Sequence, residues 1–177
     1  MILYGDLIRL RPKELDDAVQ DYAWLSDSEL SSLNARERLN MSFSEYLAEY
    51  TNLLKQPPAS KHEFAIETAE GKHIGNCAYY GFSPNKKEAE VGITIGDRDY
   101  WGKDYGRDVI NTLTSHIFKE TQLERLYLKT LKNNPRARTC FEKCGFSIYG
   151  RKANSNYSFV LMELKRQKWL KENSDLD

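Results

Sequence analysis

AEVGITIGDRDYWGKDYGRDVI, residues 89–110, is the stretch that decides the fold. Alternating apolar residues at its start are typical of a strand, glycines follow at positions 102 and 106, and the last residues open an apolar pattern with helical spacing. A helix N-terminus offers unpaired backbone N–H groups and a partial positive charge, so a glycine loop in front of it can admit an anion. Taken alone, the loop fits a phosphate site and a plain strand-to-helix turn equally well.

Outward from this stretch, the chain alternates between strand-like and helical patterns, which predicts one mixed α/β domain over residues 1–177. Strands are expected at 7–11, 62–68, 73–80, 88–96, 125–131, 146–151 and 157–164. Helices are expected at about 13–30, from a capping box of Ser42 and Glu45 to Pro57, after Gly106, and from Pro135 to about Cys144. Short connections should make the three central strands an antiparallel meander. Residues 165–177 are a charged tail, expected to be frayed or weakly helical.

The bulk composition limits the partners of the protein. Lys plus Arg and Asp plus Glu number 26 each, so the field that non-specific binding to nucleic acid or anionic lipid needs is missing. No apolar run approaches a membrane span, and MILYGDLIRLRP at the start carries charges too early for a secretory signal. Three cysteines at unrelated spacing argue against a disulfide framework. We expect a cytoplasmic protein without nucleic-acid or membrane partners, and a homodimer stays open.

Two motifs carry a resemblance to a known family. Residues 89–110 resemble the acetyl-CoA motif of the GNAT N-acetyltransferases, most closely of their RimJ/RimL-like branch, in which a strand runs into a Q/R-x-x-G-x-G/A loop and then a helix. NPRARTCFEKCGF, residues 134–146, is similar to the N-x-x-A/S and Glu-Lys-x-Gly-Phe block of that family, and LIRLRPKELDDA at residues 7–18 is similar to the start of the branch. The likeness implies a GNAT-like fold, a twisted mixed sheet of about seven strands flanked on both faces by about four helices.

The resemblance also implies an activity and a cofactor site. It implies an enzyme that moves the acetyl group of acetyl-CoA, its co-substrate, to a primary amine by direct attack, without a metal ion. The strands at 88–96 and 125–131 should splay apart to admit the cofactor. The implied cofactor-binding residues are Thr94, Ile95 and Gly96 for the pantetheine arm, Trp101, Gly102, Lys103, Asp104, Tyr105, Gly106 and Arg107 around the pyrophosphate, and Asn134 at or near the pantetheine. The glycine turn would then hold the pyrophosphate of CoA.

Two residues of the turn depart from the family pattern. Trp101 stands where the family prefers Gln or Arg, and Asp104 stands where it prefers the first motif glycine. The carboxylate of Asp104 would lie near the pyrophosphate and weaken its binding, or it would point to solvent or cap the following helix, because aspartate is a good N-cap residue. Neither departure removes the expected phosphate site, since backbone amides are expected to bind the phosphates.

Acetyl transfer from a thioester to an amine requires a base for the ammonium and a proton for the leaving thiolate. Glu90 lies on one face of the expected strand with Glu88, Gly92 and Thr94, and it matches a glutamate that the branch often carries just ahead of its glycine. It could act as the base, directly or through water. It could equally be a solvent-facing glutamate that only helps to pair strands.

The proton donor is less defined by the sequence. Many members of the family carry a tyrosine seven residues after the motif asparagine, where this chain has Phe141. Cys140 could be proposed instead, but its place on a helix favours packing, and Cys144 one turn later has no second pair of metal ligands beside it. Other hydroxyls on expected strands belong to Tyr79, Tyr80, Tyr127 and Tyr149, with nothing to choose among them. Water could also suffice.

The acceptor amine stays open between a protein N-terminus, as for RimJ and RimL themselves, and a small molecule such as a polyamine or an amino sugar. The first two expected helices, which border the acceptor site in this family, carry Tyr22, Trp24, Tyr46 and Tyr50. We expect most of these rings in the core and one or two in the acceptor pocket. The competing hypothesis is a catalytically impaired CoA-binding module for sensing or assembly, which Phe141 and Asp104 favour.

Overall fold

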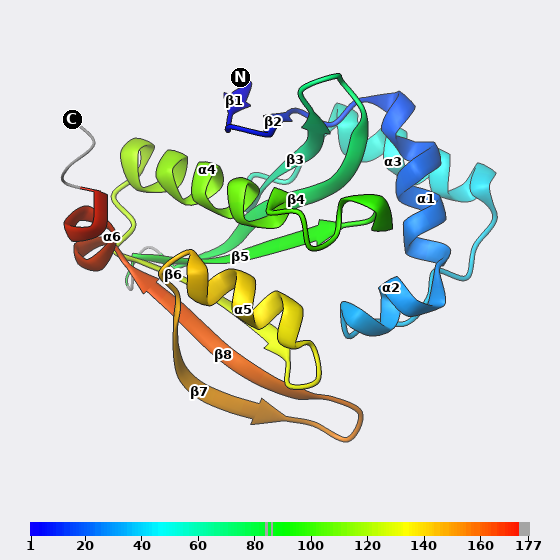
Figure 1. Ribbon diagram of the computed structural model, residues 1–177. Helices are drawn as coiled ribbons and strands as arrows, with labels where there is room; N and C mark the ends of the chain where they lie inside the picture. Colours follow the sequence, from blue (N-terminus) through cyan, green and yellow to red (C-terminus); the bar gives the residue numbers. More distant parts are fainter. Residues whose placement is uncertain (84, 86, 174–177) are drawn as a thin grey trace.

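The computed structural model describes residues 1–83, 85 and 87–173, and its centre is a mixed sheet (Figure 1). Eight strands follow the order β1-β2-β3-β4-β5-β6-β8-β7. They are β1 (Leu3–Tyr4), β2 (Ile8–Arg11), β3 (Lys61–Thr68), β4 (His73–Ser83), β5 (Glu88–Ile95), β6 (Arg125–Leu131), β7 (Ser147–Ala153) and β8 (Ser158–Lys165). The helices are α1 (Ala18–Ser26), α2 (Ser28–Leu33), α3 (Phe43–Lys55), α4 (Tyr105–Glu120), α5 (Pro135–Lys143) and α6 (Arg166–Asn173), with 3-10 turns at Leu15–Asp17 and Arg98–Tyr100.

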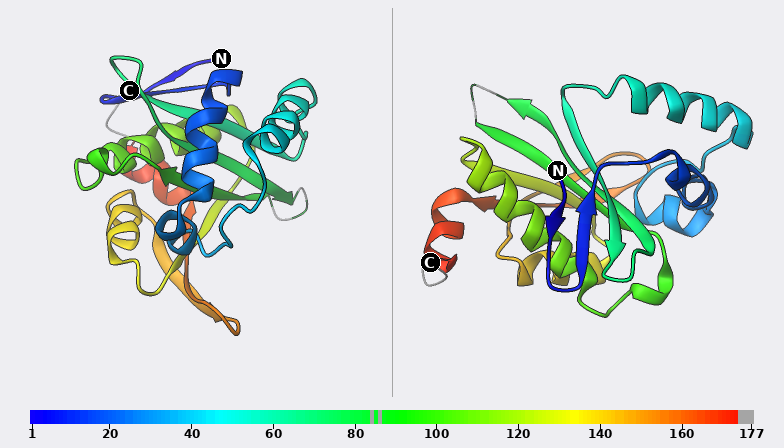
Figure 2. Two further views of the ribbon diagram at one scale, coloured as in Figure 1. Left: turned by 90° about the vertical axis from the view of Figure 1, so that its right-hand side faces the viewer. Right: turned by 90° about the horizontal axis from the view of Figure 1, so that it is seen from above.

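The predicted mixed α/β class is confirmed. β3, β4 and β5 form the expected antiparallel meander, and β6 adds to β5 in parallel. Helices lie on both sides of the sheet: α4 and α5 cover one face, and α3 lies on the other side (Figure 2). The short strand β1 is additional to the expected strands, and part of the connection between β4 and β5 lies outside the described residues.

One helix expected at residues 13–30 is wrong as a single element. The chain forms a 3-10 turn, then α1, and then a separate helix α2. Asp27 causes the break, because its backbone is extended and its side chain accepts the N–H of Leu30 at 2.9 Å, as an N-cap does. By contrast, the capping box of Ser42 and Glu45 opens α3 as predicted.

The C-terminal tail is also more ordered than the sequence indicated. It forms helix α6, which begins at Arg166. The guanidinium of Arg166 donates to the carbonyls of Phe118, Thr121 and Leu123 at 2.5–2.7 Å, which satisfies acceptors left over at the end of α4. Trp169 packs with its ring centroid 5.5 Å from that of Phe118. These tertiary contacts hold a helix whose local sequence is mostly charged, while residues 174–177 lie outside the described part.

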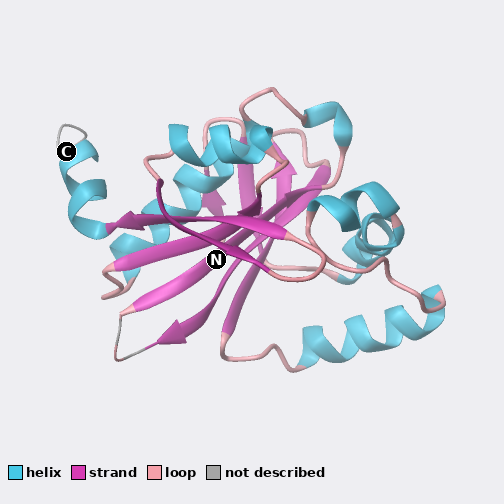
Figure 3. Ribbon diagram, turned by 90° about the horizontal axis from the view of Figure 1, so that it is seen from below, coloured by secondary structure: helices cyan, strands magenta, loops and turns pink. Residues whose placement is uncertain are grey.

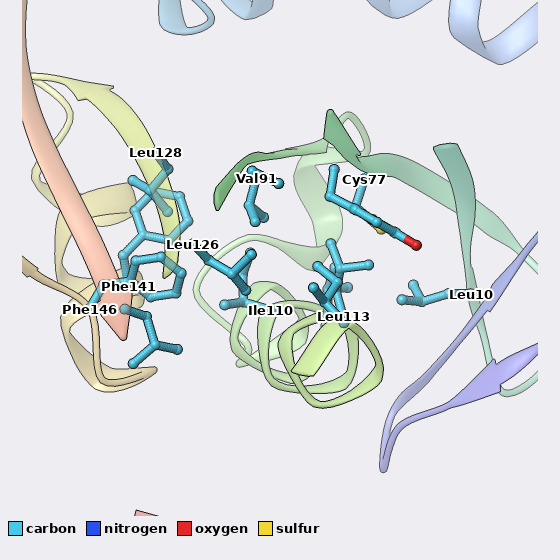
Figure 4. Close-up of a cluster of buried hydrophobic side chains, with 14 of the residues drawn as sticks. Leu10, Cys77, Val91, Ile110, Leu113, Leu126, Leu128, Phe141 and Phe146 are labelled. Carbon is cyan, nitrogen blue, oxygen red and sulfur yellow. The ribbon is translucent and has the colours of Figure 1, made fainter. Parts of the chain in front are cut away.

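The core lies between α4 and the sheet. Ile110 and Leu113 of α4 are fully buried and point toward Val91 of β5 and Leu126 of β6 (Figure 4). The same helical face continues to Ile117, as the apolar spacing predicted. This packing fixes the start of α4, and with it the glycine turn, against the end of β5.

The two central parallel strands separate, as the resemblance implied. β5 and β6 pair only from Glu88–Glu90 to Arg125–Tyr127. Beyond Glu90, β5 stays paired with β4 as far as Ile95, while β6 stays paired with β8 as far as Leu131. Seen from below, the strands fan out between the helices (Figure 3). A gap with free strand edges therefore opens directly behind Glu90.

Candidate active site

The glycine turn has two residues in the left-handed backbone region. Gly102 has φ +70°, and a Cβ on it would meet nothing within 4 Å, so its glycine serves the backbone conformation. Asp104 has φ 62° and stands at the N-cap of α4, but its side chain makes no capping hydrogen bond. The carboxylate lies 3.8 Å from the Nε of Arg107, and the side chain is 57% exposed. The side chain of Asp104 therefore does not cap α4, which was one of the roles considered for it.

The first turn of α4 leaves its amides free. Its earliest helical hydrogen bond runs from the N–H of Asp108 to the carbonyl of Asp104 at 3.0 Å. In the described part of the chain, nothing accepts the N–H groups of Tyr105, Gly106 and Arg107. A Cβ on Gly106 would have only the thiol of Cys140 nearby, at 3.5 Å. Unpaired amides at a helix start are donors suited to an anion.

A cleft of about 460 Å³ lies between this turn, the end of β5 and the start of α5, and we call it the cofactor cleft. Its charged lining within residues 1–83, 85 and 87–173 consists of Arg107, Arg136, Lys143 and the carboxylate of Asp104. Positive charge thus dominates beside the free amides, as phosphate groups require. Of the residues expected at the cofactor, the cleft is lined by Thr94, Ile95, Trp101, Gly102, Asp104, Gly106, Arg107 and Asn134.

Three other expected residues lie away from the cleft lining. Gly96 is buried under Trp24, whose ring a Cβ on Gly96 would overlap, so close packing explains this glycine. Tyr105 packs edge-on against Tyr100 at 4.9 Å between ring centroids. Lys103 is exposed at the tip of the turn. Their backbone groups remain near the turn, but their side chains do not line the cleft.

The free edge of β5 exposes alternate backbone groups. The N–H of Gly96 donates to the carbonyl of Ile74 at 2.9 Å, and thus points toward β4. Because ladder groups alternate along a strand, the N–H of Thr94 points toward β4 as well, whereas Ile93 and Ile95 face the gap. Of the three amides expected at the pantetheine arm, Ile95 is the one on the open edge. Ile93 was missed, and the pairing register was the signal needed to find it.

Trp101 fills a role that the sequence did not indicate. Its indole N–H donates to the carbonyl of Ile95 at 2.8 Å and ties the turn to the open edge of β5. The guanidinium of Arg136 lies over the indole ring, 3.6 Å from its centroid. The position where the family prefers Gln or Arg thus carries an aromatic platform, and α5 supplies a cation above it.

The second motif block positions α5 beside the gap. The side-chain oxygen of Asn134 accepts the N–H of Ala137 at 3.2 Å and caps the helix. Phe141 is buried in the core, so packing explains it. The thiol of Cys144 donates to the carbonyl of Arg107 at 3.7 Å. The neighbouring thiols lower the pKa of Cys140 and, together with burial, raise that of Cys144. Cys140 also lines the cofactor cleft.

Glu90 lies where β5 and β6 separate. Its cross-strand neighbours are Tyr80 on β4 and Tyr127 on β6. The carboxylate is 3.6 Å from the ammonium of Lys129, and its side chain is 17% exposed. Burial, together with the charge of Glu90, raises the pKa of Tyr80 to about 12, so this hydroxyl keeps its proton at neutral pH. The Tyr80 hydroxyl lies 3.6 Å from where a Cβ on Gly92 would stand, beside the gap.

The structure separates the four candidate tyrosines. Tyr79 is 5% exposed and stacks on His62, in the core. Tyr127 and Tyr149 lie beneath the guanidinium of Arg125, at 5.1 and 4.6 Å from their centroids. Tyr80 is the candidate tyrosine that lines a cavity together with Glu90.

That second cavity, of about 550 Å³, we call the acceptor cavity; it lies between α1, α3 and the strands around the gap. Trp24, Tyr46 and Tyr50 line it, more rings than the sequence indicated, whereas the hydroxyl of Tyr22 donates to the carbonyl of Met41 at 2.8 Å. Burial raises the pKa of both Tyr46 and Tyr50, which stay neutral. The acceptor cavity and the cofactor cleft share the lining residues Leu33, Asn34, Ile93, Thr94, Asn134, Ala137 and Phe141. They therefore meet at the gap.

Among residues 1–83, 85 and 87–173, no group of three or more His, Cys, Asp or Glu side chains is arranged to hold a metal ion. No helix in that part of the chain combines the length and the apolar character needed to cross a membrane.

Comparison with known proteins gives consistent matches. The family model described as acetyltransferase (GNAT) domain matches residues 8–147. The N-acetyltransferase p20 of Bacillus licheniformis is 25% identical over 133 residues, which span 75% of this chain and 74% of that protein. The spermidine N(1)-acetyltransferase of Vibrio cholerae is 29% identical over 87 residues, 49% of this chain and 50% of that protein.

A solved structure shares the fold over nearly the whole length. The crystal structure of spermidine N-acetyltransferase from Vibrio cholerae in complex with CoA and spermine has a TM-score of 0.81 and 23% sequence identity. The similarity covers 94% of this chain and 99% of that one. The family match, which spans residues 8–147 and thus most of the chain, shows that the protein belongs to the GNAT family of acetyl-CoA-dependent acetyltransferases.

Proposed function

We propose that the protein transfers the acetyl group of acetyl-CoA to the primary amine of a small molecule, by direct attack within a ternary complex. The observation that carries this proposal is the junction of the two cavities at the gap between β5 and β6, with Glu90 beside it. A thioester entering from one cavity and an amine entering from the other would meet there. Bringing two reactants together in this way supplies a large part of the rate of such a reaction.

The residues of the cofactor cleft fit CoA. The free N–H groups of Tyr105, Gly106 and Arg107 would bind the pyrophosphate, with Arg107 and Arg136 adding positive charge. The open edge of β5 at Ile93 and the N–H of Ile95 would pair with the amide groups of the pantetheine arm, as an added strand does, while the carbonyl of Ile95 accepts the indole N–H of Trp101.

The chemistry then requires the nitrogen of the acceptor to lose two protons and the departing thiolate to gain one. Glu90 would take a proton from the acceptor ammonium, directly or through water, and the free amine would attack the thioester carbonyl. A backbone N–H on the open edge of β5 would stabilise the oxyanion. As the C–N bond forms and the C–S bond breaks, Tyr80 would give its proton to the departing thiolate, and the second proton of the nitrogen would pass to the Tyr80 phenolate; water is the alternative carrier of both protons. Tyr80 takes the role for which Phe141 has no proton.

A small-molecule acceptor is supported by the relative in Vibrio cholerae, which is named for spermidine. The finer assignment to the RimJ/RimL-like branch, the homodimer and the cytoplasmic location stay predictions. The catalytically impaired CoA-binding module is the outcome to be tested against.

Two measurements test the proposal. Acetyl-CoA and CoA should both raise the melting temperature, because a ligand that binds only the native state stabilises it. Release of the CoA thiol should then be followed over a panel of primary amines. No melting shift at millimolar acetyl-CoA would reject the cofactor site. A melting shift without turnover of any amine would reject catalysis and favour the binding module.

A further inference from the structure

Among the residues that the structure describes, one cation in the lining of the acceptor cavity, Arg36, has no partner. Arg36, in the segment that follows α2, lines this cavity, and its Nε is buried without a hydrogen-bond partner. Within residues 1–83, 85 and 87–173, its side chain makes no ion pair and no hydrogen bond. A buried guanidinium nitrogen without an acceptor costs free energy, so its retention in a cavity wall suggests an absent acceptor.

The other buried or half-buried arginines have partners, unlike Arg36. Each of them pairs with a carboxylate or donates to carbonyls, and they are Arg9, Arg11, Arg125, Arg138 and Arg166. Burial lowers the pKa of Arg36, and no carboxylate within residues 1–83, 85 and 87–173 forms an ion pair that would offset that cost. Arg36 is thus the exception, and it is the one that faces the acceptor cavity.

Most carboxylates in the lining of the acceptor cavity already form ion pairs with lysines. Among the described residues, four carboxylates and four cations line this cavity. Asp21 pairs with Lys13, Glu63 with Lys61 at 3.0 Å, and Glu90 with Lys129 at 3.6 Å. In the described part of the chain, Glu49 is the lining carboxylate without an ion pair. A polycation would therefore find little unpaired negative charge, whereas an anionic group would find Arg36.

On the basis of the proposed function, we infer that the acceptor is an amine that also carries an anionic oxygen group, such as an amino acid, and that Arg36 binds this group. A guanidinium presents paired donors that match the two oxygens of a carboxylate, and it matches phosphate or phosphonate oxygens in the same way. The amine would lie toward Glu90 and the anion toward Arg36, in the same cavity. Arg36 then sets specificity and takes no part in the chemical step.

Matched acceptors test the inference. The first series is the ω-amino acids from β-alanine to 6-aminohexanoate, each beside the n-alkylamine of equal length, and the second is 2-aminoethylphosphonate and 3-aminopropylphosphonate. Acetylation is followed by thiol release, and spermidine serves as the polycationic reference. We expect at least one anionic acceptor to exceed its alkylamine about tenfold or more in kcat/KM, since a charge-assisted hydrogen bond contributes that much. The two series distinguish a carboxylate from a phosphorus oxyanion.

Variants separate specificity from structure. Arg36→Gln should raise KM for the preferred anionic acceptor by about 10- to 100-fold, leave its kcat nearly unchanged, and leave the matched alkylamine unaffected. Arg36→Lys should recover part of the loss. Arg38→Gln makes the same chemical change at an exposed arginine outside the cavity lining, and it should match the wild type. The melting temperature of Arg36→Gln should not fall, because no partner is lost.

The outcomes are distinct. An equal loss for anionic acceptors and alkylamines in Arg36→Gln, or a lowered melting temperature, would show a structural role and overturn the inference. Turnover of spermidine and alkylamines with no preference for anionic acceptors would overturn it and leave the proposed acetyltransferase function intact. Failure to acetylate any amine, with acetyl-CoA still bound, would overturn both.

Discussion

The cofactor cleft and the acceptor cavity meet at the same gap, yet they are built from different groups. The cleft offers backbone donors from the turn at residues 101–107 and from the free edge of β5, with Arg107, Arg136 and Lys143 around them. The acceptor cavity offers side chains: the rings of Trp24, Tyr46 and Tyr50, and acids that are mostly paired with lysines. Backbone groups can hold the same phosphates whatever the side chains are, whereas a side-chain wall changes with each substitution.

This difference fits the two roles that we propose, cofactor binding for the cofactor cleft and acceptor binding for the acceptor cavity. A cleft made of amides suits a ligand that the whole family shares, because sequence change leaves the donors in place. A cavity made of side chains suits a ligand that differs between members of a fold. A substitution in one cavity should therefore change either acetyl-CoA affinity or turnover of the acceptor, and leave the other unchanged.

Glu90 should give the largest effect. Glu90→Gln removes the proposed base while keeping the shape of the side chain, so kcat should fall about 10²- to 10⁴-fold. Acetyl-CoA affinity by calorimetric titration should stay the same, since Glu90 does not line the cofactor cleft. Full activity in the variant would return Glu90 to the role of a strand-pairing residue.

Tyr80→Phe is the companion experiment on the proton donor. The ring keeps its packing over Gly92, and only the hydroxyl is lost. A fall in kcat of about tenfold or more would support Tyr80 as the acid. An unchanged kcat would assign proton donation to water.

Gly106 tests the cofactor cleft through its backbone. A branched side chain there would block the approach of the pyrophosphate to the first-turn amides, so Gly106→Val should abolish the acetyl-CoA melting shift with the fold intact. Gly106→Ala is the graded control, because its Cβ would meet only the Cys140 thiol, at an ordinary 3.5 Å. It should weaken binding less than valine does. Unchanged affinity in both variants would make the turn purely structural.

The same contrast explains how far the sequence could be interpreted. The turn and the start of α4 were predictable because their signal is local: glycines, a capping position and a helical apolar pattern follow one another in the chain. The meander of β3, β4 and β5 was predictable because its connections are short. The cofactor cleft is assembled largely from such local pieces.

The acceptor cavity was not predictable in the same way. Choosing Tyr80 from four tyrosines required the strand register that places it opposite Glu90. Recognising Arg36 required knowing that, in the described part of the chain, its buried Nε has no hydrogen-bond partner, which depends on how several elements pack together. The break at Asp27 and the helix α6 were missed because a single cap and the contacts of Arg166 override the local pattern.

Substitution of Trp101 should change acetyl-CoA affinity by an intermediate amount. This residue connects the turn at residues 101–107 to the open edge of β5. Trp101→Phe keeps a ring beneath Arg136 but removes the N–H that holds the carbonyl of Ile95. We expect a loss of about 1 kcal/mol in the free energy of unfolding, the usual contribution of such a hydrogen bond. Acetyl-CoA should bind several-fold more weakly and kcat at saturation should be nearly unchanged. A drop in kcat alone would place Trp101 in the chemistry and contradict the separation of the two roles.

Asp104 should give the smallest effect, and the informative result is whether its substitution raises or lowers the affinity for acetyl-CoA. Its carboxylate is the one negative charge that the described residues contribute to the lining of the cofactor cleft, and its φ of 62° is one that glycine adopts without strain. Asp104→Gly relieves that backbone cost but adds freedom to the unfolded chain, so the free energy of unfolding should change by less than about 1 kcal/mol.

Affinity should move further than stability in this variant. Removing a carboxylate near a pyrophosphate removes a repulsion on the order of 1 kcal/mol after screening, which corresponds to acetyl-CoA binding about fivefold more tightly. The gain should shrink at high salt, and Asp104→Asn, which tolerates the same backbone, should show most of it. Calorimetric titration at two ionic strengths measures both. Because Asp104 also lies 3.8 Å from Arg107, weaker binding without salt dependence would mean that the aspartate positions this arginine, and a side chain would then contribute to a cleft that we ascribe to backbone groups.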